Sequence, residues 1–96
     1  MVGKAGGMTI RYTKTFLKSL KKRDVTVRKA FKEATGKFSM SPYDPELNNH
    51  ELERKWIGHR SIDVTADWRA VYREGSEGDG EVTYFVAIGT HEELYG

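Results

Sequence analysis

The stretch that decides the fold lies between residues 68 and 88, where W-R-A-V-Y-R (residues 68–73) precedes V-T-Y-F-V-A-I (residues 82–88). The first segment predicts a strand. The second is apolar on both faces, which favours a strand in the middle of a sheet. Between them, residues 75–80 contain three glycines and predict a loose hairpin loop. The stretch therefore predicts a hairpin at the centre of a small sheet.

Further elements are predicted on both sides of this hairpin. Residues 58–64 predict a strand, which a turn at residues 65–67 joins to the hairpin. Residues 8–12 (M-T-I-R-Y) alternate apolar and polar side chains, as a half-buried strand does. At the carboxyl end, T-H-E-E (residues 90–93) has the form of a capping box, which predicts a short final helix or turn.

The segment after the first strand predicts two helices with a very short connection. Thr13 is placed to cap the first helix. The apolar face of that helix consists of Phe16, Leu17 and Leu20. The second helix is expected to begin at Asp24 or Thr26 and to end near Thr35, with Gly36 as its stop. Its core stripe consists of Val27, Ala30, Phe31 and Ala34.

These elements give the order β-α-α-β-β-β and the class α+β, with a helical hairpin packed on a small, mainly antiparallel sheet. We expect a single domain over residues 8–96. Residues 1–7 are expected to be a disordered lead-in or a tag. Residues 37–49, which contain both prolines, predict an irregular loop.

The composition excludes several classes of protein. The 96 residues contain no cysteine, which removes disulfides, thiolate catalysis and thiolate zinc sites. No apolar run approaches the roughly 20 residues that a membrane span needs, so no membrane association is expected and the cytoplasm is the default location. No spacing of side chains indicates a metal site, and no cofactor is expected.

The charges are distributed unevenly along the chain, although the net charge is only +2. Residues 11–37 contain ten Lys or Arg against two acidic residues, and the remainder is net acidic. This distribution favours a phosphate-rich partner on one side of the molecule and an acidic regulator. A solvated helical face would have the same composition.

Four short motifs follow one another between residues 50 and 96: H-E-L, W-I-G-H-R, D-W-R-A-V-Y and G-T-H-E-E-L-Y-G. Together they resemble the YafQ-like branch of the RelE/ParE toxins, whose order of elements is the order predicted above. The resemblance covers residues 8–96. It implies a toxin of a type II toxin–antitoxin system, with an antitoxin as partner, that cleaves messenger RNA in the decoding site of the ribosome.

The implied reaction needs no metal. The ribose 2′-OH attacks the adjacent phosphate and leaves a 2′,3′-cyclic phosphate and a 5′-OH. The site therefore needs a base, an acid and a cation that steadies the phosphorane. Histidine suits both proton-transfer roles because its unperturbed pKa lies near neutral pH.

The resemblance also implies roles for residues of this chain. His91, in the G-T-H ending, is the expected general acid or phosphate contact, and His50 is a second candidate catalytic histidine. Asp67 is placed to orient a histidine or to act as a base, whereas Trp68 is either an RNA contact or part of the core. Tyr95 is expected to stack on a base or to support the phosphate.

The chain departs from its YafQ-like relatives at two positions. Asp63 stands in the strand after G-x-R, where a histidine is usual, and Ala87 stands where an arginine is common. Asp63 is then a candidate base, unless His59, on the same predicted strand face, supplies the missing imidazole. If neither does so, His50 is the base and His91 the acid.

Arginines are the expected contacts for the RNA phosphate. Arg69 is the first choice to stabilise the phosphorane, and it also stands in for the arginine that is missing at position 87. Arg60 and Arg73 are the second and third choices.

Two other functions stay open at this point. A ParE-like gyrase poison shares the fold and needs no catalytic histidine. A non-catalytic module that binds nucleic acid or an antitoxin would tolerate Asp63 and Ala87.

Overall fold

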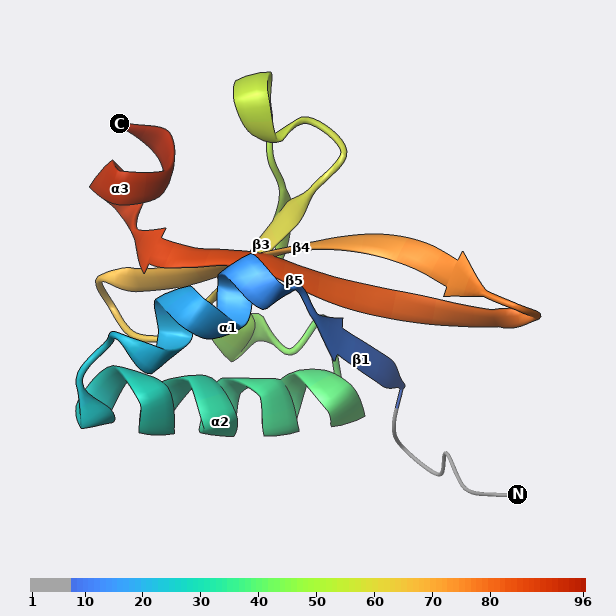
Figure 1. Cartoon of the computed structure of the whole chain (residues 1–96), viewed down its shortest axis with the longest axis horizontal. Coiled ribbons are helices and arrows are strands. Elements are labelled where there is room, and N and C mark those ends of the chain that lie inside the picture. The colour runs from blue at the N-terminus through green and yellow to red at the C-terminus, as the bar shows by residue number, and fades with distance from the viewer. Residues whose placement is uncertain (1–7) are drawn as a thin grey trace.

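A five-stranded sheet with two helices packed on one of its faces forms the body of the molecule (Figure 1). The computed structural model describes residues 8–96, so the expectation for residues 1–7 lies outside the described part of the chain. In chain order, the elements are β1 (Thr9–Tyr12), α1 (Lys14–Lys21), α2 (Val25–Met40), the 3-10 turn η1 (Pro45–Leu47), β2 (His50–Glu51), the 3-10 turn η2 (Arg54–Trp56), β3 (Arg60–Asp63), β4 (Trp68–Glu77), β5 (Gly80–Thr90) and α3 (His91–Tyr95).

The strands lie in the order β1-β5-β4-β3-β2. β1 pairs with β5 in parallel, and all other neighbouring strands are antiparallel. β5 therefore lies between β1 and β4, which confirms that the doubly apolar segment forms an interior strand. The α+β class and the predicted order of elements are also confirmed, with β2 as an additional short strand.

Both helices begin at side-chain caps that the sequence indicates. The Thr13 hydroxyl accepts a hydrogen bond from the backbone N–H of Phe16 at 3.1 Å, and the Asp24 carboxylate accepts one from Val27 at 3.1 Å. These bonds satisfy backbone donors that have no partner within the helix. Asp24, and not Thr26, therefore starts α2.

The prediction that α2 ends at Gly36 was wrong, because the helix continues to Met40. Phe38 explains the extension. Its side chain is only 1% exposed, and its ring lies 5.0 Å from that of Tyr72 and 5.6 Å from that of Phe85. Burying one aromatic ring contributes more than the roughly 1 kcal/mol that a glycine costs inside a helix.

One predicted core residue of α1 lies outside the core. Leu17 is 48% exposed, whereas Phe16 is fully buried and Leu20 packs partly against the core. Adjacent helical residues are separated by about 100° around the axis, so burying Phe16 turns Leu17 toward solvent. The short helix has room for only a narrow apolar stripe.

The glycine-containing segment was wrongly predicted to be a loose loop. β4 and β5 stay paired as far as Glu77 and Gly80, so only Gly78 and Asp79 form the turn. Gly78 has a φ of 58°, which suits glycine in a two-residue hairpin turn. The long ribbon extends well beyond the rest of the sheet (Figure 1).

A β-bulge in β5 sets the two faces of the sheet. Val71 pairs with Ala87 and Tyr72 pairs with Phe85, so Val86 has no partner in the register. The extra residue allows Phe85 and Ile88 to face the helices although they are three positions apart.

Within the described residues, no helix is long and apolar enough to cross a membrane.

Candidate active site

A cleft of about 420 Å³ lies between the short β2 strand, β4 and the carboxyl-terminal helix α3. Its lining consists of Asn48, His50, Glu51, Leu52, Glu53, Arg69, His91 and Tyr95. Ala70 and Tyr72 of β4 are part of the core under the helices, so alternation directs Arg69 to the opposite face of the sheet. The cleft therefore lies away from the helical hairpin, and it brings together four of the predicted site residues.

His50, directly after the predicted loop, belongs to β2 and pairs with Ser61 of β3. The Nδ1 atom of its ring lies 2.8 Å from the backbone carbonyl oxygen of Asn48. A carbonyl only accepts hydrogen bonds, so Nδ1 carries a hydrogen in this contact. The Nε2 atom of the neutral ring is then free to accept a proton.

His91 is the first residue of α3, and its ring contacts that of Tyr95 one turn later. The two ring centroids are 4.7 Å apart in an edge-to-face arrangement. The predicted capping box is present, since Thr90 and Glu93 exchange two hydrogen bonds of 3.1 Å. Leu94 is buried, and the position of His91 therefore depends on a short helix that is fixed by its cap and by one apolar anchor.

Arg69 is held at the edge of the cleft by the turn between β3 and β4. Its Nη1 atom donates to the carbonyl oxygens of Thr65 and Ala66 at 3.1 and 3.0 Å. Its Nε atom lies 3.1 Å from Oδ1 of Asp63, the residue directly opposite on β3. Among the described residues the Nη2 atom makes no hydrogen bond, so one edge of the guanidinium is left for a ligand.

Asp63 does not line the cleft. Besides its ion pair with Arg69, it borders a small cavity of about 180 Å³ against α2. The ion pair with Arg69 therefore competes with any role of the Asp63 carboxylate as a free base.

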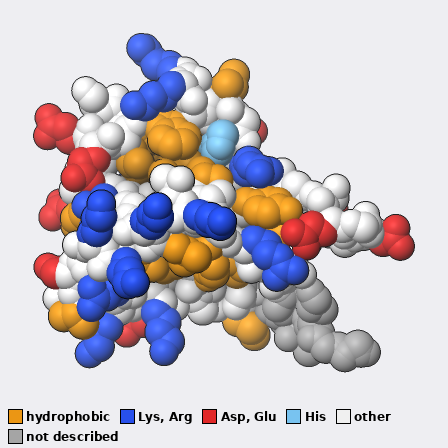
Figure 2. Space-filling view, in the orientation of Figure 1, with side chains coloured by type: hydrophobic (Ala, Val, Ile, Leu, Met, Phe, Trp, Pro, Cys, Tyr) orange, Lys and Arg blue, Asp and Glu red, His pale blue; other side chains and the backbone are white. Residues whose placement is uncertain are grey.

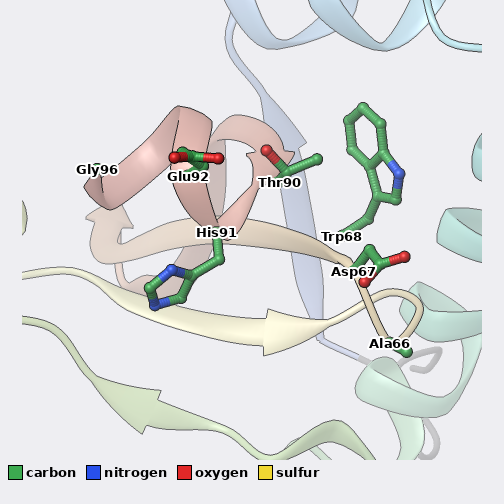
Figure 3. Close-up of a pocket in the computed structure, with 7 residues that line it drawn as sticks. All are labelled: Ala66, Asp67, Trp68, Thr90, His91, Glu92 and Gly96. Atoms are coloured by element: carbon green, nitrogen blue, oxygen red, sulfur yellow. The ribbon is translucent and has the colours of Figure 1, made fainter.

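Asp67 and Trp68 line a neighbouring cavity of about 600 Å³, which shares His91 with the cleft. In Figure 3 the Asp67 carboxylate points away from the His91 ring, and Trp68 points to the side opposite that ring. The Trp68 ring instead lies under the guanidinium of Arg23, with 4.9 Å between the Arg23 Cζ atom and the ring centroid. The structure therefore does not bring Asp67 into contact with His91, and it joins Trp68 to the helical hairpin.

The remaining predicted residues lie outside the cleft. The Nε atom of Arg60 donates to Asn49 at 2.8 Å. The guanidinium of Arg73 stacks over the Tyr84 ring at 4.5 Å. The His59 ring contacts the Trp56 ring, and its Nδ1 atom lies 3.3 Å from the carbonyl oxygen of Ile57. His59 is not placed to supply an imidazole to the cleft.

Sequence reasoning missed three residues of this region. Glu51 and Glu53 line the cleft, and Trp56 donates from its indole Nε1 to the carbonyl oxygen of Leu94 at 2.8 Å. The glutamates closely follow His50 in the sequence, which could have drawn attention to them. Trp56 belongs to the W-I-G-H-R motif, but only the fold shows that it reaches α3.

The charge of the helices contrasts with that of the cleft. We define the basic helical surface as the seven exposed cations Lys14, Lys18, Lys21, Lys22, Arg28, Lys29 and Lys32. Figure 2 shows Lys and Arg side chains gathered over α1 and α2. The cleft has a single arginine beside two glutamates and two histidines. Residues 8–96 contain no group of three His, Cys, Asp or Glu side chains that could hold a metal ion.

Solved structures of small bacterial toxins have the same fold. The YoeB/ParE toxin from Agrobacterium tumefaciens superposes with a TM-score of 0.69 at 17% identity, over 88% of this chain and 99% of that one. YafQ from E. coli strain BL21(DE3) gives a TM-score of 0.64 at 24% identity, over 93% and 99% of the two chains. A chain of the E. coli DinJ-YafQ complex gives 0.63 at 26% identity, over 93% and 99%. The fold is thus that of a RelE/ParE-type toxin.

The family within this class follows from the sequence. Residues 8–96 match the family model for the bacterial toxin of type II toxin-antitoxin system, YafQ. The chain therefore belongs to the YafQ family of type II toxins, which confirms the resemblance carried by the four motifs. None of the curated proteins compared with the chain matches it significantly.

Proposed function

We propose that this toxin is a metal-independent endoribonuclease that cleaves messenger RNA on the ribosome and so inhibits translation in the cytoplasm. The observation that carries the proposal is the meeting of His50, Arg69, His91 and Tyr95 in one cleft, although they come from three separate elements. Two imidazoles and a guanidinium can supply the base, the acid and the cation that transesterification of RNA requires.

Each group has a role in the proposed reaction. His50 Nε2 removes the proton of the ribose 2′-OH, and the 2′-oxygen forms a bond to the adjacent phosphorus. Arg69 stabilises the crowded phosphorane through its free Nη2 edge. His91 then donates a proton to the 5′-oxygen as the P–O5′ bond breaks. The products are a 2′,3′-cyclic phosphate and a 5′-OH end.

Asp63 acts in this scheme through Arg69 and not as the base. Its ion pair at 3.1 Å holds the guanidinium at the edge of the cleft, while His50 has a ring nitrogen free to accept a proton. Tyr95 packs against the ring of His91 and offers an aromatic surface to the RNA. Among the candidate bases that the sequence left open, the geometry favours His50.

The basic helical surface supports a second part of the proposal, contact with ribosomal RNA. It lies on the face of the sheet opposite the cleft. The toxin would thus present cations to the ribosome and its cleft to the message. Phosphate contacts of this kind position a protein without reading sequence.

We also propose that a cognate antitoxin covers the toxin, with an acidic segment over the basic helical surface or the site. Relatives with this fold occur in toxin–antitoxin complexes, namely the E. coli DinJ-YafQ complex and the Mycobacterium tuberculosis complex RelBE2. The uneven charge of this chain fits a partner of opposite charge.

Single-turnover cleavage of ribosome-bound message tests the proposed roles. His91→Ala and His50→Ala should each lower the rate by roughly 10²- to 10⁴-fold, the usual worth of a positioned acid or base, without unfolding the protein. His59→Gln is the matched control, because that imidazole lies outside the cleft. Cleavage should continue with a chelator once the ribosome's own Mg²⁺ is maintained.

Two results would contradict the proposal. Wild-type rates in both histidine variants would remove His50 and His91 from the chemistry. Inhibition of DNA supercoiling without any mapped 5′-OH ends would identify a gyrase poison instead.

A further inference from the structure

A second, smaller cavity opens next to the cleft, on the far side of Tyr95. This slot has a volume of about 240 Å³ and is lined by Glu53, Arg54, Lys55, Trp56 and Tyr95. Glu53 and Tyr95 also line the cleft, so the slot adjoins it. A ligand that binds in the cleft can therefore extend its neighbouring chemical group into the slot.

The aromatic wall of the slot is rigidly placed. The indole Nε1 of Trp56 donates to the carbonyl oxygen of Leu94 at 2.8 Å, and Leu94 itself is buried. The Trp56 and His59 rings also lie edge-to-face, with 5.4 Å between their centroids. Trp56 thus ties the turn η2 to α3, and its partly exposed side chain lines the slot together with Tyr95.

The charged side chains of the slot make no ion pair or hydrogen bond with residues 8–96. Arg54 and Lys55 are exposed, and within the described residues neither makes a salt bridge. Glu53 precedes η2 but does not cap it with its side chain. Arg54 also has a φ of 59°, an uncommon conformation for a residue with a Cβ. The backbone therefore turns sharply at the rim of the slot.

We propose that the slot binds one unpaired nucleobase of the RNA strand whose scissile phosphate lies in the cleft. The inference rests on the proposed ribonuclease function and adds a subsite to it. A base offers a flat aromatic face to Trp56 and Tyr95, and its flanking phosphates meet Arg54 and Lys55. The Glu53 carboxylate accepts hydrogen bonds, so it favours bases with an exocyclic amino group over uracil.

The test is the affinity of the toxin for ribosomes programmed with a message that carries 2′-deoxyribose at the cleavage position and so cannot be cut. An abasic residue is placed at each position of the codon in turn. For wild-type toxin, one position should cost roughly 5- to 150-fold in affinity, which is the usual worth of a stacked base. In Trp56→Leu that penalty should become clearly smaller, because only Tyr95 is then left to stack on the base.

Three further variants separate base binding from support of α3. Trp56→Phe loses the bond to Leu94 but keeps an aromatic face, so the abasic penalty should be largely retained. Ile57→Ser changes an exposed neighbour, 75% accessible and outside the slot, and should behave like the wild type. Glu53→Gln should weaken the preference for amino-bearing bases at the same position.

The outcomes distinguish this inference from the proposed function. One outcome is that the abasic substitution lowers the affinity by the same factor for wild-type toxin and for Trp56→Leu, while the normal message is still cleaved. In that case the slot is not a base site, and the ribonuclease proposal stands. If the toxin neither binds programmed ribosomes nor cleaves their message, the proposed function fails and the subsite fails with it.

Discussion

The proposed role of Arg69 depends both on a turn close to it in the sequence and on a strand that the fold places beside it. It stands beside a turn whose carbonyl oxygens of Thr65 and Ala66 hold its Nη1 atom, and its Nε atom faces Asp63. These contacts fix the plane of the guanidinium before RNA arrives. Catalysis by a pre-placed cation requires no reorganisation at the moment of reaction.

Arg69→Lys is expected to lower cleavage more than about tenfold, because lysine keeps the charge but loses the planar group whose Nη1 and Nε atoms are held by the protein while Nη2 is left for the phosphate. Arg73→Lys is the matched control, since Arg73 stacks on Tyr84 away from the cleft, and it should be nearly silent. Single-turnover rates on ribosome-bound message measure both. The reverse ranking would mean that the active surface lies elsewhere on β4.

Asp63→Asn tests whether the carboxylate positions Arg69 or removes a proton itself. If it only holds the guanidinium, cleavage should fall by less than about tenfold, the factor that corresponds to 1.4 kcal/mol of barrier. The pH dependence of the rate between pH 5 and 9 should keep its shape. Loss of the acid limb of that profile in Asp63→Asn would make Asp63 the base and displace His50.

At the scale of elements, the length of α2 is decided by its contacts and not by its local signals. Gly36 is an ordinary stop signal, but the helix passes through it because Phe38 reaches the aromatic cluster under the sheet. α3 is the opposite case, since its five residues have the capping box that the sequence indicates. Capping signals survive in the fold because their partners are close in sequence.

Gly36→Ala should therefore stabilise the protein. A Cβ at this exposed helical position would meet no atom within 4 Å, and alanine avoids the backbone entropy cost of glycine. We expect a gain of about 0.5–1 kcal/mol in the free energy of unfolding, measured by denaturant titration.

Gly89→Ala is the contrasting variant for the same measurement. A Cβ there would lie 2.9 Å from Oε1 of Glu93 and 3.3 Å from Leu94, so the capping box and the anchor of α3 would be disturbed. We expect this change to destabilise the protein. A stability loss in Gly36→Ala would show that α2 is strained at that turn.

At the scale of the whole molecule, two faces with different chemistry lie on opposite sides of one sheet. Residues 11–37 contain ten Lys or Arg against two acids, whereas residues 38–96 contain five against twelve. The fold places most of the first set over the helices (Figure 2) and brings the cleft to the other side. An acidic partner and an RNA strand can thus approach different surfaces.

Binding of the cognate antitoxin should weaken as salt is raised. Exposed charges are screened beyond about 8 Å at physiological ionic strength, compared with about 30 Å at 0.01 M. Lys18→Gln combined with Lys29→Gln should reduce the salt dependence, with thermal stability unchanged as the control. Titration calorimetry at several salt concentrations measures this. A dissociation constant that stays the same across the series would exclude electrostatic attraction as the basis of recognition.

The sequence by itself determined the order of the main elements, the Thr13 cap of α1, the capping box of α3 and the family. These features depend on side chains within a few residues of each other or on apolar periodicity along one segment. It also singled out His50, Arg69, His91 and Tyr95 as site candidates. Residue type and the resemblance were sufficient for that step.

Only the tertiary structure decided which candidates share a cleft. Arg60 and Arg69 are both arginines on predicted strands, but pairing and alternation direct them to opposite faces of the sheet. Likewise, a two-residue strand such as β2 has no period to detect, and its position depends on hydrogen bonds to β3. The bond from Trp56 to Leu94 joins residues 38 apart in the chain. Contacts at such separations are set by packing, so they have no signature in the local sequence.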